Sequence, residues 1–172
     1  MPPRPKPRIV ADTNIFVPAM VGATAQPPGM SASAGLIRGW RAGLCTLVVS
    51  APLLAEYVDV MRRPQFGLAP ARAQRLCAVV AKAALEVEPD LGRSLLRRDP
   101  DDNMVLLTAV AGRADLLVTD NTTDFAEVAT LSGASPGPRY RGVRVVGLGA
   151  CLDAIRAEHA GADRIMRRRT RW

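Results

Sequence analysis

The feature that most limits the possible folds is an alternation of short apolar runs with longer segments of helical character. Strand-like runs of β-branched and apolar residues occur at 8–11, 45–50, 115–119 and 143–147. Apolar residues at helical spacing occur in segments 32–42, 51–63, 70–84, 102–112 and 148–158. Strands that alternate with helices favour a mostly parallel sheet covered by helices. The sequence therefore predicts a three-layer α/β/α fold with a central, mostly parallel sheet.

Local signals set several boundaries within this alternation. Ser50 can cap the helix that follows it, and Pro64 ends that helix. Residues 22–33 are rich in Gly, Pro, Ala and Ser, so they are expected to form a loop. Residues 86–89 favour a short strand or a linker, and residues 91–96 a helical or irregular approach to an acidic cluster.

The length and the charge indicate one domain with an anionic partner. The chain has 172 residues, of which 48% are hydrophobic, and this is the size of a single compact domain spanning residues 1–172. Lys and Arg number 23 against 16 Asp and Glu, and the formal net charge of +7 favours a polyanion such as nucleic acid. Part of this charge lies in a basic, proline-rich extension, residues 1–7, and in an arginine-rich tail, about residues 160–172.

The cysteines and the apolar segments favour a cytoplasmic protein. The three cysteines show neither a disulfide framework nor the spacing of a zinc site. The basic N-terminal segment is not followed by the apolar run and cleavage site of a signal peptide. No segment approaches the roughly 20 apolar residues that a membrane-spanning helix needs.

Four acidic residues are expected to meet at one edge of the predicted sheet. Asp12 ends the first strand, Asp120 follows the 115–119 strand, Asp102 begins a helix, and Glu56 lies early in the helix after the second strand. Ligands of open parallel sheets bind outside the carboxyl ends of the strands. Clustered carboxylates suit Mg²⁺ or Mn²⁺, which can activate water for hydrolysis of a phosphodiester. The single histidine, His159, lies outside these motifs and disfavours a histidine-centred site.

Each acid also has a structural alternative. Asp12 could cap the following turn with help from Asn14, and Glu56 could be a solvated helix residue. Asp102 could be favoured by the dipole of its own helix. Asp120 and Asp124 could belong to an Asx-turn and a helix start, so no acid taken alone defines a metal site.

Four segments resemble, in order, the motifs of PIN-domain proteins. They are I-V-A-D-T-N-I-F-V from residue 9, L-L-A-E-Y-x-x-V-M-R-R-P from residue 53, R-D-P-D-D-N-x-x-L-x-x-A from residue 98 and L-L-V-T-D-N-T-x-D-F from residue 116. The resemblance covers about residues 8–155 and is closest to the toxin components of toxin–antitoxin systems related to VapC-type toxins. It implies a PIN-like fold.

The resemblance also implies roles for individual residues. Asp12, Glu56 and Asp102 match the first three metal-binding acids of the family. The fourth motif is one residue longer here, so either Asp120 or Asp124 matches the fourth acid, and Asn121 could stand where the family has a carboxylate. The polar residues implied to support the site are Thr13, Asn14, Thr119 and Asn121.

The function implied by the resemblance is that of a Mg²⁺- or Mn²⁺-dependent endoribonuclease, held inactive by a small antitoxin and assembled as a homodimer. Candidate RNA contacts are Arg38, Arg41, Arg62 and Arg63. Asn121 keeps open an alternative, a catalytically impaired PIN-like module that binds RNA or protein. A Mg²⁺-dependent phosphatase or phosphotransferase is disfavoured because Asn14 replaces the second acid of a D-x-D motif.

Overall fold

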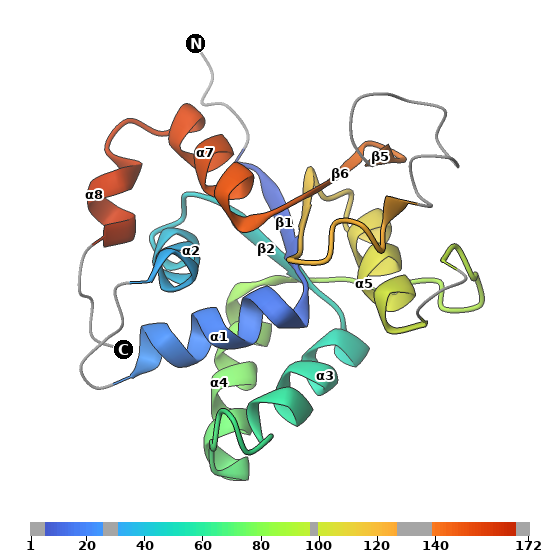
Figure 1. Ribbon diagram of the computed structural model, residues 1–172, viewed down its shortest axis with the longest axis horizontal. Coiled ribbons are helices and arrows are strands. Elements are labelled where there is room, and N and C mark those ends of the chain that lie inside the picture. The colour runs from blue at the N-terminus through green and yellow to red at the C-terminus, as the bar shows by residue number, and fades with distance from the viewer. Residues whose placement is uncertain (1–5, 26–30, 97–99, 127–138, 168–172) are drawn as a thin grey trace.

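The computed structural model describes residues 6–25, 31–96, 100–126 and 139–167, and its centre is a six-stranded sheet (Figure 1). The strands lie in the order β3-β2-β1-β4-β6-β5. Those from β3 to β6 pair in parallel, whereas β5 pairs antiparallel with β6. The strands are β1 (Arg8–Ala11), β2 (Thr46–Val49), β3 (Leu85–Glu86), β4 (Leu116–Val118), β5 (Arg139–Tyr140) and β6 (Val143–Val146). The predicted mostly parallel sheet is confirmed.

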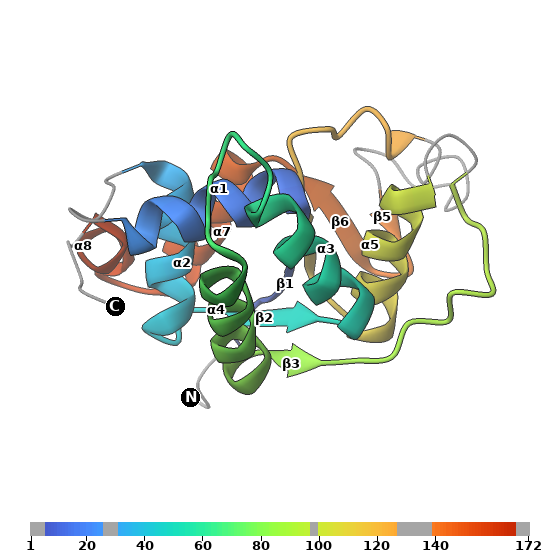
Figure 2. The ribbon, with the colours of Figure 1, turned by 90° about the horizontal axis from the view of Figure 1, so that it is seen from below.

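Helices cover both faces of this sheet, which gives the predicted three layers. Figure 1 shows α5 on one side of the strands and α1, α2 and α7 on the other. In the view of Figure 2, α3 and α4 lie in front of the strands. The helices are α1 (Thr13–Thr24), α2 (Ala32–Arg41), α3 (Ala51–Met61), α4 (Pro70–Ala83), α5 (Pro100–Ala111), α7 (Leu148–Glu158) and α8 (Ala162–Arg167). None of the helices within the described ranges is long and apolar enough to cross a membrane.

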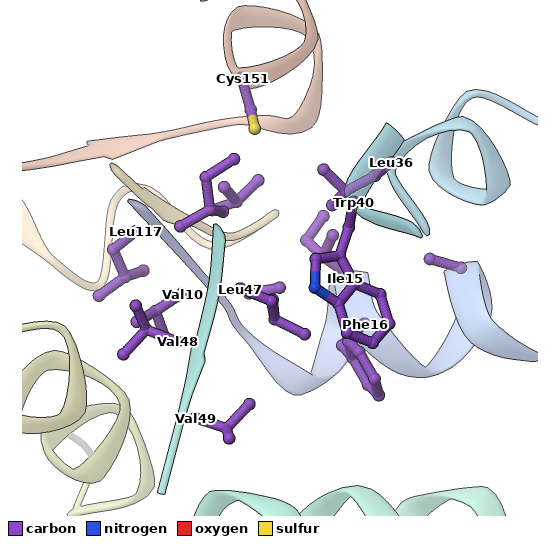
Figure 3. Packing of buried hydrophobic residues seen from close by; sticks show 14 of the residues in the cluster. Val10, Ile15, Phe16, Leu36, Trp40, Leu47, Val48, Val49, Leu117 and Cys151 are labelled. Carbon is purple, nitrogen blue, oxygen red and sulfur yellow. The ribbon is translucent and has the colours of Figure 1, made fainter. Parts of the chain in front are cut away.

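The two faces of β2 show how the layers are held together. Leu47 and Val49 lie on the side of α1 and α2, whereas Val48 lies on the opposite side (Figure 3). On that side the residue that follows α5, Gly112, comes so close to β2 that a Cβ added to it would lie 2.3 Å from Val48 Cγ1. All three apolar β2 residues are buried, so this central strand is covered on both faces, as expected for a parallel sheet.

The helix α1 corrects the sequence prediction, which placed a loop from residue 22 and assigned no helix between the first strand and that loop. The helix begins at Thr13 and runs through residue 22 to Thr24. Its N-cap is Asp12, whose carboxylate accepts a hydrogen bond from the Thr13 backbone N–H. Burial of a stripe of apolar side chains against the sheet outweighs the β-propensity of this segment. That stripe consists of Ile15, Phe16, Ala19, Met20 and Ala23.

The remaining differences are small, apart from two elements that the sequence did not predict. The helix predicted from residue 102 begins at Pro100, residues 85–86 form β3, and residues 91–96 are irregular. The strand β5 was not predicted, and neither was α8. Part of the predicted loop at 22–33, residues 26–30, lies outside the described residues.

The helix α8 packs on α2, side by side with it in both Figure 1 and Figure 2. Two glycines of α2, Gly35 and Gly39, leave room for Met166, whose atoms would lie 3.2–3.3 Å from a Cβ at either position. Arg38 lies between these glycines, is buried, and donates a hydrogen bond from Nε to the Met166 carbonyl oxygen at 2.7 Å. Residues 162–167, from the arginine-rich end of the chain, thus form part of the packed structure.

Candidate active site

The sheet has a topological switch point between β1 and β4. These strands are neighbours, but the chain continues from β1 towards β2 and β3 on one side, and β4 is followed by β6 on the other. The Asp12 backbone N–H still bonds to the Val118 carbonyl oxygen, at 2.9 Å. Because ligands of open α/β sheets bind in the crevice at such a point, the residues that follow β1 and β4 are the first place to look for function.

Asp12 lies at this switch point, hereafter called the crevice, and is only 6% exposed. Its Oδ1 accepts a hydrogen bond from the Thr13 N–H, and its Oδ2 accepts one from the Thr119 hydroxyl, both at 2.6 Å. Burial raises the pKa of the Asp12 carboxyl, the nearby charge of Asp120 adds to this, and hydrogen bonds from Thr119, Thr13 and Asn14 act in the opposite direction. Among the described residues, the contacts of Asp12 are thus neutral donors and a second negative charge.

Thr119 connects the two strand ends. Its hydroxyl donates to Asp12 and accepts hydrogen bonds from the Asn121 N–H at 3.0 Å and from Asn14 Nδ2 at 3.3 Å. Asn14 in turn accepts a hydrogen bond from the Asp120 N–H through Oδ1, at 3.3 Å. Thr119 is fully buried, so its hydroxyl fixes the orientation of Asp12 without exposure to water.

Glu56 reaches the same crevice from α3. The Thr13 hydroxyl donates to Glu56 Oε1 at 2.6 Å, so Thr13 contacts two carboxylates, one through its backbone and one through its side chain. The next residue, Tyr57, is fully buried, donates its hydroxyl to the Ala11 carbonyl oxygen, and stacks on Phe16 with ring centroids 3.9 Å apart. Tyr57 thereby anchors α3 at the end of β1, a role that could not be predicted from the sequence because an aromatic residue at helical spacing indicates only burial.

The turn after β4 separates the two candidates for the fourth acid. Asp120 is exposed, and its charge contributes to the raised pKa of Asp12. Asn121 contributes its backbone N–H to Thr119, and the residue is exposed. Of these three residues, Asp120 therefore lies in the electrostatic environment of Asp12.

Asp102 lies in the first turn of α5 and is 9% exposed. Its neighbour Asn103 holds the approach to this helix, because Oδ1 accepts hydrogen bonds from the N–H groups of Leu95 and Leu96, at 2.8 and 3.3 Å, and Nδ2 donates to the Arg93 carbonyl oxygen at 2.8 Å. The sequence analysis did not single out Asn103. An Asn in the first turn of a helix is a weak signal, since such residues often bond to nearby backbone groups.

The four arginines considered as RNA contacts divide into two groups. Arg38 is buried at 4% exposure, and the bond from its Nε to the Met166 carbonyl oxygen holds α8 on α2. Arg41, Arg62 and Arg63 are exposed. Only these three present their side chains to solvent.

The donor set of the site suits a hard divalent cation. A carboxylate oxygen can accept about two hydrogen bonds, so each oxygen of Asp12 keeps acceptor capacity beyond its protein partner. Within the described ranges no group of three or more His, Cys, Asp or Glu residues forms a ready-made cage for an ion. Mg²⁺ fits such a site, because it commonly binds through one or two carboxylates and keeps several waters.

A parallel sheet with carboxylates at its switch point defines an α/β protein with a polar site at the carboxyl edge. A model of the PIN domain family matches residues 8–123, more than half of the 172 residues. The chain therefore belongs to the PIN-domain family, and the PIN domain is a nuclease-type fold whose members are generally hydrolases. No curated protein matches the chain at a significant level.

Proposed function

We propose that this protein is a Mg²⁺- or Mn²⁺-dependent endoribonuclease whose active site is the crevice at Asp12. One observation carries the proposal: Asp12 is buried beside a second negative charge, and its partners in the described part of the chain are neutral. A buried carboxylate without a compensating charge is costly, and such residues concentrate at functional sites. A divalent cation would supply the missing charge.

The residues that would hold the cation are Asp12, Glu56, Asp102 and Asp120. When bound, the cation activates a water molecule and stabilises the charge that develops on the phosphate oxygens. Thr119 and Thr13 keep the Asp12 carboxylate in one orientation, and Thr13 ties Glu56 to it. Asp120 is favoured over Asp124 because its charge acts on Asp12.

RNA as the substrate suits the charge and the exposed arginines. The formal net charge of +7 favours a polyanion, and Arg41, Arg62 and Arg63 can bind phosphates without reading sequence. The resemblance to VapC-type toxins supports a toxin role, with a small antitoxin as inhibitor and a homodimer as the assembly. A cytoplasmic location fits this role.

The test is RNA cleavage by the Asp12→Asn variant. We expect loss of metal-dependent cleavage, because the amide keeps an acceptor for the Thr13 N–H but removes the negative charge. Asp163→Asn is a matched control on the far side of the molecule, where Asp163 pairs with Arg156, and it should cleave like the unchanged protein. Undiminished cleavage by Asp12→Asn would overturn the proposal.

The second candidate is a PIN-like module that binds RNA or protein without cleaving. It is favoured by Asn121, an amide in the fourth motif, and by the lack of a three-acid group among the residues described. Titration calorimetry with Mn²⁺ separates the candidates. A saturable site that disappears in Asp12→Asn supports the nuclease, whereas no saturable site supports the binding module.

A further inference from the structure

Two buried hydroxyls outside the crevice join the helices that carry Glu56 and Asp102. Ser50 caps α3, Thr108 lies in α5, and both residues are fully buried. The Ser50 and Thr108 side-chain oxygens are 2.8 Å apart. Ser50 also accepts a hydrogen bond from the Leu53 N–H at 3.4 Å.

The direction of this bridge follows from the protons available. Thr108 donates its only hydroxyl proton to the Met104 carbonyl oxygen, at 2.9 Å. Ser50 must therefore donate to Thr108, since a hydroxyl has one proton and two acceptor sites. The result is a directed chain of hydrogen bonds from the Leu53 N–H through Ser50 and Thr108 to the Met104 carbonyl.

The ends of this chain lie in the same helices as two of the proposed metal-binding acids, within three residues of them. Leu53 is three residues before Glu56 in α3, and Met104 is two residues after Asp102 in α5. The close contact between Gly112 and Val48 places the C-terminal end of α5 against β2. Along α5, the hydroxyl bridge at Thr108 lies between this contact and the first turn of the helix. The bridge therefore links α5 to the N-cap of α3, and these are the two helices that carry the acids.

We propose that Ser50 and Thr108 are positioning residues that hold Glu56 and Asp102 at the spacing needed to bind one divalent cation. This inference rests on the proposed function. Groups that orient metal ligands without contacting the metal commonly contribute about 10- to 100-fold to affinity. A hydroxyl bridge fixes the distance between its two oxygens, and it acts in addition to the apolar packing of α5 on β2.

The experiment measures Mn²⁺ affinity by titration calorimetry in Thr108→Val, which keeps the shape of the side chain and removes its hydrogen bonds. We expect affinity about tenfold lower than in the unchanged protein, and near-complete recovery in Thr108→Ser. The matched control is Thr24→Val, because Thr24 is also buried and donates to the carbonyl four residues earlier, Met20, at 2.8 Å. Thr24→Val should bind Mn²⁺ normally.

A double variant keeps the test decisive if Thr108→Val folds poorly. Ser50→Ala with Thr108→Val removes both partners, which is usually better tolerated than leaving one buried hydroxyl unpaired. Its control is Ser31→Ala with Thr24→Val, since Ser31 caps α2 in the same way. The double variant should also lose about tenfold in Mn²⁺ affinity, and its control should not.

The outcomes separate this inference from the function on which it rests. Normal Mn²⁺ affinity in the bridge variants, or an equal loss in the controls, overturns the inference while leaving the proposed function intact if Asp12→Asn still abolishes binding. A failure of the unchanged protein to bind Mn²⁺ overturns the proposed function and this inference with it.

Discussion

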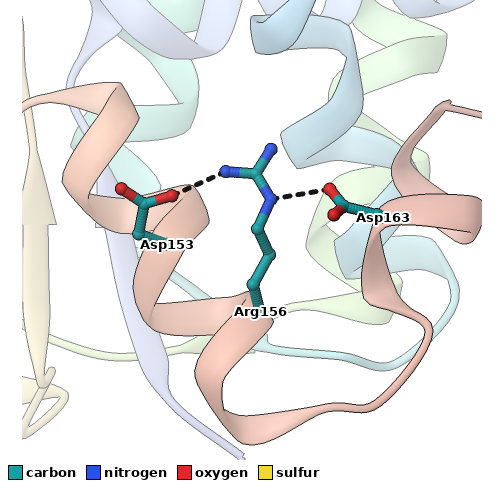
Figure 4. A network of polar contacts seen from close by, with 3 residues as sticks. All are labelled: Asp153, Arg156 and Asp163. Atoms are coloured by element: carbon teal, nitrogen blue, oxygen red, sulfur yellow. Dashed lines mark hydrogen bonds and ion pairs between the residues drawn. The ribbon is translucent and has the colours of Figure 1, made fainter.

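Two groups of carboxylates in this protein are held in opposite ways. On the surface, Arg156 donates to Asp153 of the same helix, α7, and to Asp163 of α8, both at 2.7 Å (Figure 4). These two acids are 75% and 58% exposed. In the crevice, Asp12 is 6% exposed, and its donors are neutral groups such as the Thr119 hydroxyl.

The difference separates a surface pair that water screens from a buried carboxylate that the proposed chemistry would use. Water screens the surface pairs, so ions at the α7–α8 contact contribute little to stability. A buried carboxylate costs free energy unless charge and hydrogen bonds compensate for it. Each oxygen of Asp12 accepts a hydrogen bond from the protein, but no described residue places a positive charge beside it. This is the arrangement expected if a metal cation from solution binds there.

The largest expected effect is a loss of folding stability at alkaline pH, caused by the burial of ionisable groups. Burial raises the pKa of Cys45 and Cys151 from 9.0 to about 12 in each case. The folded protein therefore keeps both thiols neutral up to a pH at which the unfolded chain has lost these protons. The thiol contribution to stability should be complete below pH 9 and decline by about 1.4 kcal/mol per pH unit for each thiol as the pH rises towards 12.

Urea unfolding at a series of pH values measures this decline. Replacing Cys45 and Cys151 with alanine should make the decline shallower and leave the smaller contribution of Cys77, whose pKa burial raises to about 11. Arg156→Ala at the exposed contact should leave the slope unchanged. An unchanged slope in the variant without Cys45 and Cys151 would show that other groups cause the alkaline loss.

The second prediction concerns the donor that holds Asp12. Thr119→Val should lower the free energy of unfolding by about 2 kcal/mol, because it leaves a buried carboxylate oxygen without its hydrogen bond. Thr119→Ser keeps the hydroxyl and should recover most of this loss. Equilibrium unfolding in urea compares the three proteins, and equal stability of Thr119→Val and the unchanged protein would contradict a fixed orientation of Asp12.

The third prediction concerns Asp12 without metal. Asp12→Asn should be more stable than the unchanged protein by about 1 kcal/mol at neutral pH in the presence of a chelator, because it removes a buried charge that only the proposed function requires. Added Mg²⁺ should stabilise the unchanged protein by binding the folded state and leave Asp12→Asn unaffected. Thermal unfolding with and without Mg²⁺ measures both effects. A less stable Asp12→Asn would mean that the hydrogen bonds to the carboxylate outweigh its burial.

The smallest effect is expected at the exposed contact. Arg156→Ala should change the thermal midpoint too little to resolve at physiological salt, since both acids lose only a screened partner. Added Mg²⁺ should stabilise this variant as much as the unchanged protein. A marked loss of stability would show that the α7–α8 contact is more than a surface ion pair.

Local sequence signals predicted much of the fold because they act over a few residues. The cap at Ser50 gave the start of α3, and the predicted 148–158 helix matches α7 in both bounds. The order of strands and helices was sufficient to predict a mostly parallel sheet. The short strand β5 and the helix α8 were missed because their residues carry little periodic pattern of their own.

The candidate site was predictable in part. The motifs placed Asp12 and Thr119 at the ends of two predicted strands, and the structure joins them by a hydrogen bond. The roles of Asn103 and of the Ser50–Thr108 bridge could not be predicted, because each depends on contacts between segments far apart in the chain. The set of metal-binding acids stays a prediction.

The sequence by itself determined the alternation of strands and helices, the capping residues and the acids at the carboxyl ends of the strands. The hydrophobic period, the cap residues and the order of elements along the chain each depend on short stretches of sequence. Tertiary structure decided which segments had to be helical and which polar groups are buried. It made residues 13–24 a helix and placed Arg38 under α8, since burial against the sheet and against α2 outweighs local preference. It also decided that Asp12 lies buried among neutral donors, which no single stretch of the chain could specify.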